Sequence, residues 1–243
     1  DAAELNPTDS VLEVGPGIGT LTQGLAQSGA SVTAVELDRR LPEILAVTVG
    51  GYENVRIVQG DILQVNIPEL MDNKPFKVVA NLPYYITTPI IMALLERKLP
   101  IERLVVMVQR EVAERMVAAP GTKAYGALSV AVQYYTEPHI VMDVPPKAFM
   151  PAPEVTSAVV CCKRRTEPPV QVKDEKILFR VIKAAFAQRR KTFSNTMKTT
   201  GLPKETIAAV LEKAGIDGQR RGETFSLDEF AAVANAWIEV EGL

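Results

Sequence analysis

The stretch Ser10-Val11-Leu12-Glu13-Val14-Gly15-Pro16-Gly17-Ile18-Gly19 decides the fold, because an apolar strand runs directly into a glycine-rich turn. Glycines at such a turn permit a tight bend and let a ligand approach the backbone closely. Dinucleotide enzymes place a similar turn after the first strand of an open α/β sheet, with Gly-x-Gly-x-x-Gly spacing. The spacing here is Gly-x-Gly-x-Gly with Pro16 inside it. The stretch predicts the first strand-to-helix unit of a cofactor-binding sheet.

Apolar runs alternate with helical patterns through the first two thirds of the chain, as expected for strands covered on both faces. The predicted strands are Ser10–Val14, Ser31–Leu37, Val55–Val58, Lys77–Ala80, Leu104–Val108, His139–Val144 and Ser157–Lys163. The predicted helices between them are Gly19–Ser28, Arg39–Thr48, Thr88–Arg97 (capped by Thr88 with Pro89 in its first turn), Arg110–Val117 and Gly126–Tyr135. This repetition predicts an α/β fold with a doubly wound, mostly parallel seven-stranded sheet.

The last third of the chain has a purely helical pattern. It follows the charged segment 164–173, which contains Pro168-Pro169 and resembles a linker. The predicted helices are Glu175–Ala187, Lys204–Ala214 and Leu227–Val240, the last with a capping box formed by Ser226 and Glu229 and a hydrophobic staple formed by Phe225 and Phe230. We therefore expect two domains, residues 1–165 and residues 166–243.

Composition excludes several classes of site. The chain has 243 residues, 47% of them hydrophobic, and no apolar run as long as a membrane span. Its only histidine is His139, which disfavours a metal centre and a histidine-activated nucleophile. Its two cysteines, Cys161 and Cys162, are adjacent, which disfavours a loop-closing disulfide and a zinc site. The net charge of −2 disfavours a broad basic surface. We expect a cytoplasmic protein, monomeric, without metal or membrane partner.

Polar residues end the second and third strands, where open sheets bind ligands. Glu36 is placed to bind ribose hydroxyls; the alternative is that it only neighbours a helix start. Asp61, in Gly60-Asp61-Ile62, is placed to accept a hydrogen bond from an adenine amino group; the alternative is a simple turn residue. S-adenosylmethionine and NAD both present these groups, so each residue alone is weak evidence. Together with the glycine turn and the motif after the fourth strand, they indicate one ligand site.

That motif is Asn81-Leu82-Pro83-Tyr84. Asn81 offers a side-chain acceptor, and the carbonyl of Leu82, held extended by the following proline, offers a second. Tyr84 offers a face for stacking. Two acceptors that grip the hydrogens of a nucleobase amino group localise its lone pair for attack on an electrophilic carbon. The alternative is an ordinary Asn-Pro turn.

These motifs, taken together, resemble those of the ribosomal RNA adenine N6-dimethyltransferases. The resemblance spans essentially the whole chain and rests on the segments 11–17, 35–38, 60–61, 81–86, 108–115, 125–130, 149–157, 186–192 and 221–226. Segments 186–192 and 221–226 are similar to the branch that modifies paired adenines near the 3′ end of small-subunit (16S) RNA and takes part in subunit maturation. The branch that modifies 23S RNA and confers macrolide resistance shares the core motifs and is the main alternative. A mainly non-catalytic assembly factor and an NAD-dependent oxidoreductase are further alternatives.

The resemblance implies a class I methyltransferase fold with S-adenosylmethionine as cofactor and 16S rRNA in the small subunit as partner. The implied cofactor residues are Glu13, Gly15, Gly17, Glu36, Leu37, Gly60, Asp61, Ile62 and Asn81. The implied catalytic residues are Asn81, Leu82, Pro83, Tyr84 and Phe149, where Phe149 is the second stacking aromatic or, alternatively, a core residue. The methyl group is expected to pass in line to adenine N6 without a strong general base, in two rounds.

Basic residues are candidate RNA contacts: Arg110, Arg115, Lys123, Arg189, Arg190 and Lys191. The last three follow a predicted helix, so complementing the helix dipole is an equally good explanation for them. The family also carries a Gln-Asn-Phe-Leu segment before the first strand, which is not found ahead of Val11. We interpret the sequence as truncated or processed, and expect a weakened cofactor pocket.

Overall fold

The computed structural model describes all 243 residues, and they form two compact units. The first comprises Asp1–Glu114 and Thr136–Arg164, and the second comprises Arg115–Tyr135 and Arg165–Leu243. The chain thus divides at Arg164 and Arg165, beside the expected boundary at residue 165. Residues 115–135, which we expected in the first domain, group instead with the C-terminal helices.

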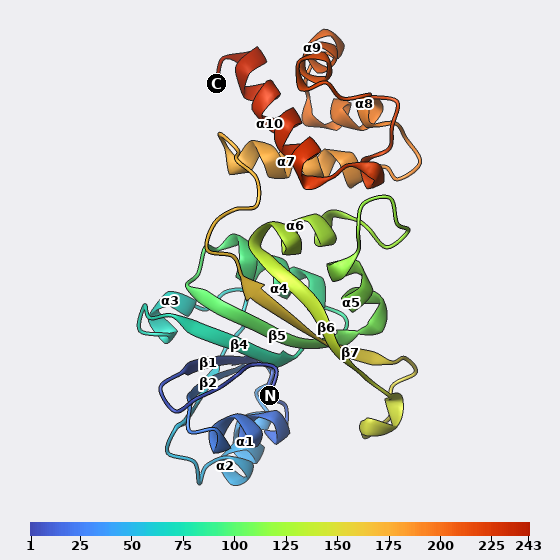
Figure 1. Cartoon of the computed structure of the whole chain (residues 1–243). Coiled ribbons are helices and arrows are strands. Elements are labelled where there is room, and N and C mark those ends of the chain that lie inside the picture. Colours follow the sequence, from blue (N-terminus) through green and yellow to red (C-terminus); the bar gives the residue numbers. More distant parts are fainter. The chain divides into compact units, whose positions relative to one another are not determined.

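The first unit is built on a seven-stranded sheet with the order β3-β2-β1-β4-β5-β7-β6 (Figure 1). Its strands are β1 (Ser10–Val14), β2 (Ser31–Glu36), β3 (Val55–Gln59), β4 (Phe76–Asn81), β5 (Ile101–Gln109), β6 (Thr136–Val144) and β7 (Ser157–Arg164). The strands β1 to β5 pair in parallel, and β7 pairs antiparallel with both β5 and β6. The predicted doubly wound, mostly parallel sheet is confirmed.

Helices cover both faces of the sheet, as right-handed crossovers require. The helices α1 (Thr20–Gln27) and α2 (Leu41–Thr48) lie on one face of the sheet (Figure 1). The helices α3 (Ile67–Leu70) and α4 (Thr87–Glu96) belong to the crossovers from β3 to β4 and from β4 to β5, which run across the sheet in the opposite direction. One core cluster joins Leu25 of α1 to alternate strand residues, including Val11, Val32 and Val79. Because neighbouring strand residues face opposite sides, both faces are buried, which explains the continuous apolar runs.

The predicted start of α4 was wrong by one residue. We expected Thr88 to cap the helix, but α4 begins at Thr87, and no side chain caps it. The Thr87 hydroxyl instead donates to the Pro83 carbonyl oxygen at 2.9 Å. The helix start is therefore tied to the preceding Asn81–Tyr84 turn. The short helix α3 was not expected, since four residues with Pro68 carry little periodic signal.

The second unit is helical. It comprises the end of α5 (Arg110–Val117), α6 (Ala127–Tyr135), α7 (Glu175–Ala187), α8 (Phe193–Thr196), α9 (Lys204–Ala214) and α10 (Leu227–Glu241). Short 3-10 turns lie at η2 (Met197–Thr200) and η3 (Gly222–Thr224), and η1 (Pro146–Ala148) belongs to the first unit. The capping box of Ser226 and Glu229 is present at the start of α10, as predicted.

Aromatic packing explains why α6 joins the second unit. Phe179 of α7 stacks on Tyr135 and meets Tyr134 edge-on, with ring centroids 5.6 and 5.4 Å apart. Tyr125 packs against Phe186, and its hydroxyl donates to the Phe225 carbonyl oxygen at 3.0 Å. These contacts join segments that are about 50 to 100 residues apart, so no local pattern announces them.

Candidate active site

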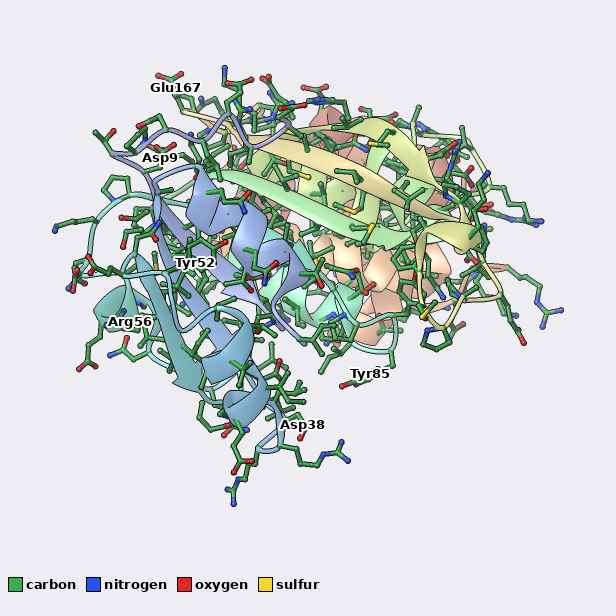
Figure 2. The ribbon with its side chains drawn as sticks, turned by 90° about the horizontal axis from the view of Figure 1, so that it is seen from below. Asp9, Asp38, Tyr52, Arg56, Tyr85 and Glu167 are labelled. Carbon is green, nitrogen blue, oxygen red and sulfur yellow. The ribbon has the colours of Figure 1, made fainter.

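A cavity of about 310 Å³ opens at the carboxyl ends of the parallel strands. Figure 2 shows Asp38 and Tyr85, two of its lining residues, well away from Asp9 and Arg56, which lie at the amino ends of β1 and β3. The cavity is lined by Val14, Gly15, Val35, Glu36, Leu37, Asp38, Gly60, Asp61, Ile62, Pro83, Tyr85, Ile86 and Ile90. The first four strand ends therefore contribute to one site, as the sequence indicated.

The glycine turn leaves room for a ligand. Gly15 and Gly17 have φ angles of +67° and +59°, and a methyl group added to either would meet nothing within 4 Å. Their conformation favours glycine, and the space beside them is open. Gly19 differs, since a methyl group there would lie 2.9 Å from both Thr48 and Val49. Gly15 and Gly17 fit a cradle for a bound molecule, and Gly19 fits close packing of α1 on α2.

The carboxylate of Glu36 is fixed by two backbone groups. One oxygen accepts from the Asp38 N–H at 2.7 Å, and the other accepts from the Gly17 N–H at 3.2 Å. Glu36 is buried, and it lines the cavity. It therefore holds the glycine turn against the end of β2. Each carboxylate oxygen keeps a second lone pair, which suits a ligand with two adjacent hydroxyl groups.

The end of β3 supplies another carboxylate with an apolar neighbour. Asp61 accepts from the Leu63 N–H at 2.9 Å and from the Gln64 side-chain amide at 3.1 Å, so the turn interpretation of this residue holds. Asp61 still lines the cavity, together with Ile62 and the exposed Leu37. An acceptor between two aliphatic side chains suits the edge and faces of a flat heterocycle such as adenine.

Glu13, which the resemblance implied as a cofactor residue, is an unusual titratable group beside the glycine turn. Its side chain is 1% exposed, and its Oε2 has no hydrogen-bond partner. Burial raises the pKa of the Glu13 carboxyl to about 7; the nearby Thr22 side chain acts to lower that pKa, and the charge of Glu36 raises it further. Glu13 precedes the cavity-lining Val14, but it is not itself among the residues that line the cavity.

A second cavity, of about 270 Å³, adjoins the Asn81–Tyr84 turn. It is lined by Asn81, Leu82, Pro83, Tyr84, Phe149, Pro151 and Pro153. The structure thus brings all five residues expected to be catalytic to one place. Phe149 is half-buried at the edge of the cavity, so it is not an ordinary core residue.

The carbonyl groups of Leu82 and Pro83 differ in their hydrogen bonding. The Pro83 oxygen accepts from the Thr87 hydroxyl and from the Ile86 N–H. The Leu82 N–H donates to the Met107 carbonyl at 3.1 Å, while no group of the chain donates to the Leu82 oxygen. The Asn81 side chain is exposed. The turn therefore presents two acceptors, the Asn81 amide and the Leu82 carbonyl, beside an aromatic ring.

Comparison with known families agrees with this geometry. A sequence model of the family described as ribosomal RNA adenine dimethylase matches residues 1–238. The chain belongs to the ribosomal RNA adenine dimethylase family. It is an S-adenosylmethionine-dependent enzyme, and the glycine cradle, Glu36 and Asp61 fit that cofactor.

Individual relatives are similar over most of their length. The chain is 51% identical over 252 residues to ribosomal RNA small subunit methyltransferase A of Geobacillus kaustophilus (strain HTA426), covering 100% of this chain and 86% of the relative. It is 51% identical over 242 residues to the protein of that name from Moorella thermoacetica (strain ATCC 39073 / JCM 9320), covering 96% and 84%.

Two solved structures share the fold over nearly the whole chain. A dimethyladenosine transferase from Plasmodium falciparum superimposes with a TM-score of 0.78 at 25% identity, covering 96% of this chain and 90% of that one. The 23S rRNA methyltransferase ErmE superimposes with a TM-score of 0.70 at 29% identity, covering 96% and 93%.

The basic residues of the dimethylase fall into two groups. Arg110, in the first unit, forms ion pairs with Asp143 and with Glu114, so its charge is already balanced. In the second unit, Lys123, Arg190 and Lys191 are exposed, Arg115 is half-buried, and the exposed Arg189 donates to the Lys123 carbonyl oxygen. Helix α7 ends at Ala187 with no basic residue in its last turn. Arg189, Arg190 and Lys191 follow the C-cap residue Gln188 directly, so the dipole explanation stays an alternative for them.

Sequence reasoning missed some residues of the dimethylase site. The Ser157 hydroxyl forms a hydrogen bond with the Tyr84 hydroxyl, and the Thr87 hydroxyl donates one to the Pro83 carbonyl oxygen. Neither follows a motif spacing, although the segment 149–157 that ends at Ser157 was one of those that carried the resemblance.

None of the helices is both long and apolar enough to cross a bilayer.

Glu13→Gln is expected to change how stability depends on pH. The folded-state pKa of about 7 lies above the ordinary value of 4.5, so folding favours the protonated carboxyl. Stability is lost as pH rises from about 4.5 to 7, because the buried charge must then form. Glutamine removes this cost, so the variant should gain up to about 3 kcal/mol relative to wild type at pH 8 and little at pH 4.5.

Urea unfolding at the two pH values, followed by circular dichroism, measures this difference. The exposed Glu53→Gln variant controls for the loss of one negative charge. An equal difference between Glu13→Gln and wild type at both pH values would contradict the prediction.

Proposed function

We propose that the enzyme dimethylates N6 of the paired adenines near the 3′ end of 16S rRNA in the small ribosomal subunit, and so takes part in subunit maturation. The support is the name carried by relatives that are 51% identical over the full chain, against 29% identity for a 23S rRNA methyltransferase. The motifs of the helical unit point to the same branch.

The observation that carries the chemistry is the pair of unoccupied acceptors at the Asn81–Tyr84 turn. An adenine amino group is a poor nucleophile, because its lone pair is delocalised into the ring. The Asn81 amide oxygen and the Leu82 carbonyl accept its two hydrogens, which localises the lone pair. Tyr84 and Phe149, on the walls of the cavity, hold the extruded base by stacking.

The cofactor supplies a methyl group on a positively charged sulfur, which is a good leaving group. The protein therefore acts mainly by orienting the two reactants in line. Glu36 and Asp61 orient the nucleoside part of the cofactor. Asn81, at the end of β4, lines the second cavity, and Pro83, two residues later, lines both cavities. The proton leaves N6 after transfer, when the nitrogen has become acidic, so no general base is required.

A cluster of cations in the second unit is the proposed RNA contact. The Phe193 N–H donates to the Arg220 carbonyl at 2.7 Å, and the Gly121 N–H donates to the Glu223 carbonyl at 2.7 Å, so three distant segments run side by side. They carry the exposed Lys123, Arg189, Arg190, Lys191 and Arg221. Such a set suits phosphate groups of a folded RNA.

Asn81→Ala is expected to lower the rate of methyl transfer by 10²-fold or more, about the cost of losing one preorganised polar group at a reacting centre. Binding of S-adenosylmethionine, measured by calorimetry, should fall far less. Asn81→Asp keeps a side-chain acceptor and should retain more activity than the alanine variant. Near-normal transfer by Asn81→Ala would refute the acceptor pair.

The substrate is tested with isotopically labelled S-adenosylmethionine and unmethylated ribosomal subunits. Mass spectrometry of 16S and 23S RNA should find labelled N6,N6-dimethyladenosine at adjacent positions near the 3′ end of 16S RNA. Label confined to 23S RNA would overturn the assignment. An Asn81→Ala enzyme that still supports subunit maturation in cells would favour the assembly-factor alternative.

Arg190→Ala and Lys191→Ala should each weaken RNA binding and reduce the slope of log K against log salt by about 1 per phosphate contact. Filter binding of small subunits at several salt concentrations measures both quantities. Lys204→Ala removes an exposed cation from α9 and serves as the control, with an unchanged slope. Unchanged slopes for the first two variants would exclude the cluster as the RNA contact.

A further inference from the structure

Tyr84 has one polar partner, and that partner is deeply buried. The Tyr84 hydroxyl lies 2.5 Å from the Ser157 hydroxyl, and Ser157 is 0% exposed. Ser157 is the first residue of β7, where it pairs with Gln109 of β5 and with Val144 of β6. A strand residue held on both sides has little freedom to move. The bond therefore fixes the far end of the Tyr84 side chain to the sheet.

A hydroxyl bond at the end of the ring restricts χ1 of Tyr84, because rotation about the Cα–Cβ bond would move the hydroxyl away from Ser157. The ring is half-buried and lines the cavity beside Asn81. The backbone on its other side is held as well, since Thr87 donates to the Pro83 carbonyl. The ring is thus held in position at both ends, which suits a surface against which a flat base stacks.

The same serine ends the connection that forms the opposite wall. Phe149, Pro151 and Pro153 belong to the segment 145–156 between β6 and β7, and Ser157 follows it directly. The Arg110 N–H also donates to the Thr156 carbonyl at 2.9 Å, so the end of this segment is tied to the sheet. One hydroxyl pair therefore joins the two walls of the cavity, which come from distant parts of the chain.

We propose that Ser157 is a positioning residue for methyl transfer, acting through the Tyr84 hydroxyl to set the slot between Tyr84 and Phe149. The inference rests on the proposed role of this cavity in holding the target base. A slot of fixed width matters most in the second round, when the base already carries one methyl group on N6. Loss of the bond should therefore affect the second methylation more than the first.

The test is a double-mutant cycle of Ser157→Ala and Tyr84→Phe, measured on unmethylated small subunits. Each single variant should lower kcat by about three- to tenfold, the range for one hydrogen bond, and should accumulate N6-monomethyladenosine. The double variant should be no slower than either single variant, because both remove the same bond. Calorimetry should show unchanged S-adenosylmethionine affinity.

Ser129→Ala is the matched control. Ser129 is also 0% exposed, and its hydroxyl donates to the Arg115 carbonyl at 2.5 Å, within the second unit. Loss of that buried bond should leave the ratio of monomethyl to dimethyl product at the wild-type value. If Ser157→Ala misfolds, Tyr84→Phe breaks the same bond from the half-buried side and carries the test alone.

Additive effects in the cycle, or an unchanged product ratio in both single variants, would overturn the inference. The outcome is separable from that of the proposed function. If Asn81→Ala abolishes transfer while Ser157→Ala and Tyr84→Phe behave as wild type, only the positioning role fails. If Asn81→Ala transfers methyl groups normally, the acceptor pair fails instead.

Discussion

Parallel pairing of β1 with both β2 and β4 is the constraint on which the site depends. Val14 lies opposite Val35, and Leu12 lies opposite Val78, so the strands end at the same edge of the sheet. The glycine turn follows β1 directly, and Glu36 and Asn81 are the last residues of β2 and β4. Residues far apart in the sequence thereby reach one site without any motif that contains them all. A shift of one residue in either pairing would turn alternate side chains to the opposite face and break up the site.

The strands and the cavity-lining residues at their ends were predictable because their signals are local. Continuous apolar runs give the strand positions within one to three residues, and glycine or carboxylate residues at strand ends indicate a ligand site. Glu36 also shows the limit of this reasoning. Its expected alternatives were a ribose ligand or a helix-start neighbour, and its carboxylate bonds both Asp38 and the glycine turn. One carboxylate can serve the fold and a ligand at once, since each oxygen has two lone pairs.

The remaining features depend on contacts between distant segments. Ser157 is an ordinary residue for the start of a strand, and only the folded sheet places it 2.5 Å from Tyr84. Thr88 and Pro89 match a helix start, yet the Thr87 hydroxyl donates to the Pro83 carbonyl, and the helix begins one residue earlier, at Thr87. Helix α6 follows the sheet pattern in the sequence but buries its tyrosines against Phe179. In each case a tertiary contact overrides a local preference, which a single sequence cannot reveal.

In the proposed function, charged and uncharged residues have different roles. The cavity at the Asn81–Tyr84 turn is lined only by uncharged side chains, so its hydrogen bonds to a neutral amino group are little affected by salt. The exposed cations of the proposed RNA contact, Lys123, Arg189, Arg190, Lys191 and Arg221, all belong to the helical unit. A near-neutral chain with a net charge of −2 therefore needs no broad basic surface. On the proposed roles, affinity for the ribosomal subunit can change through the helical unit while the uncharged cavity continues to select the base.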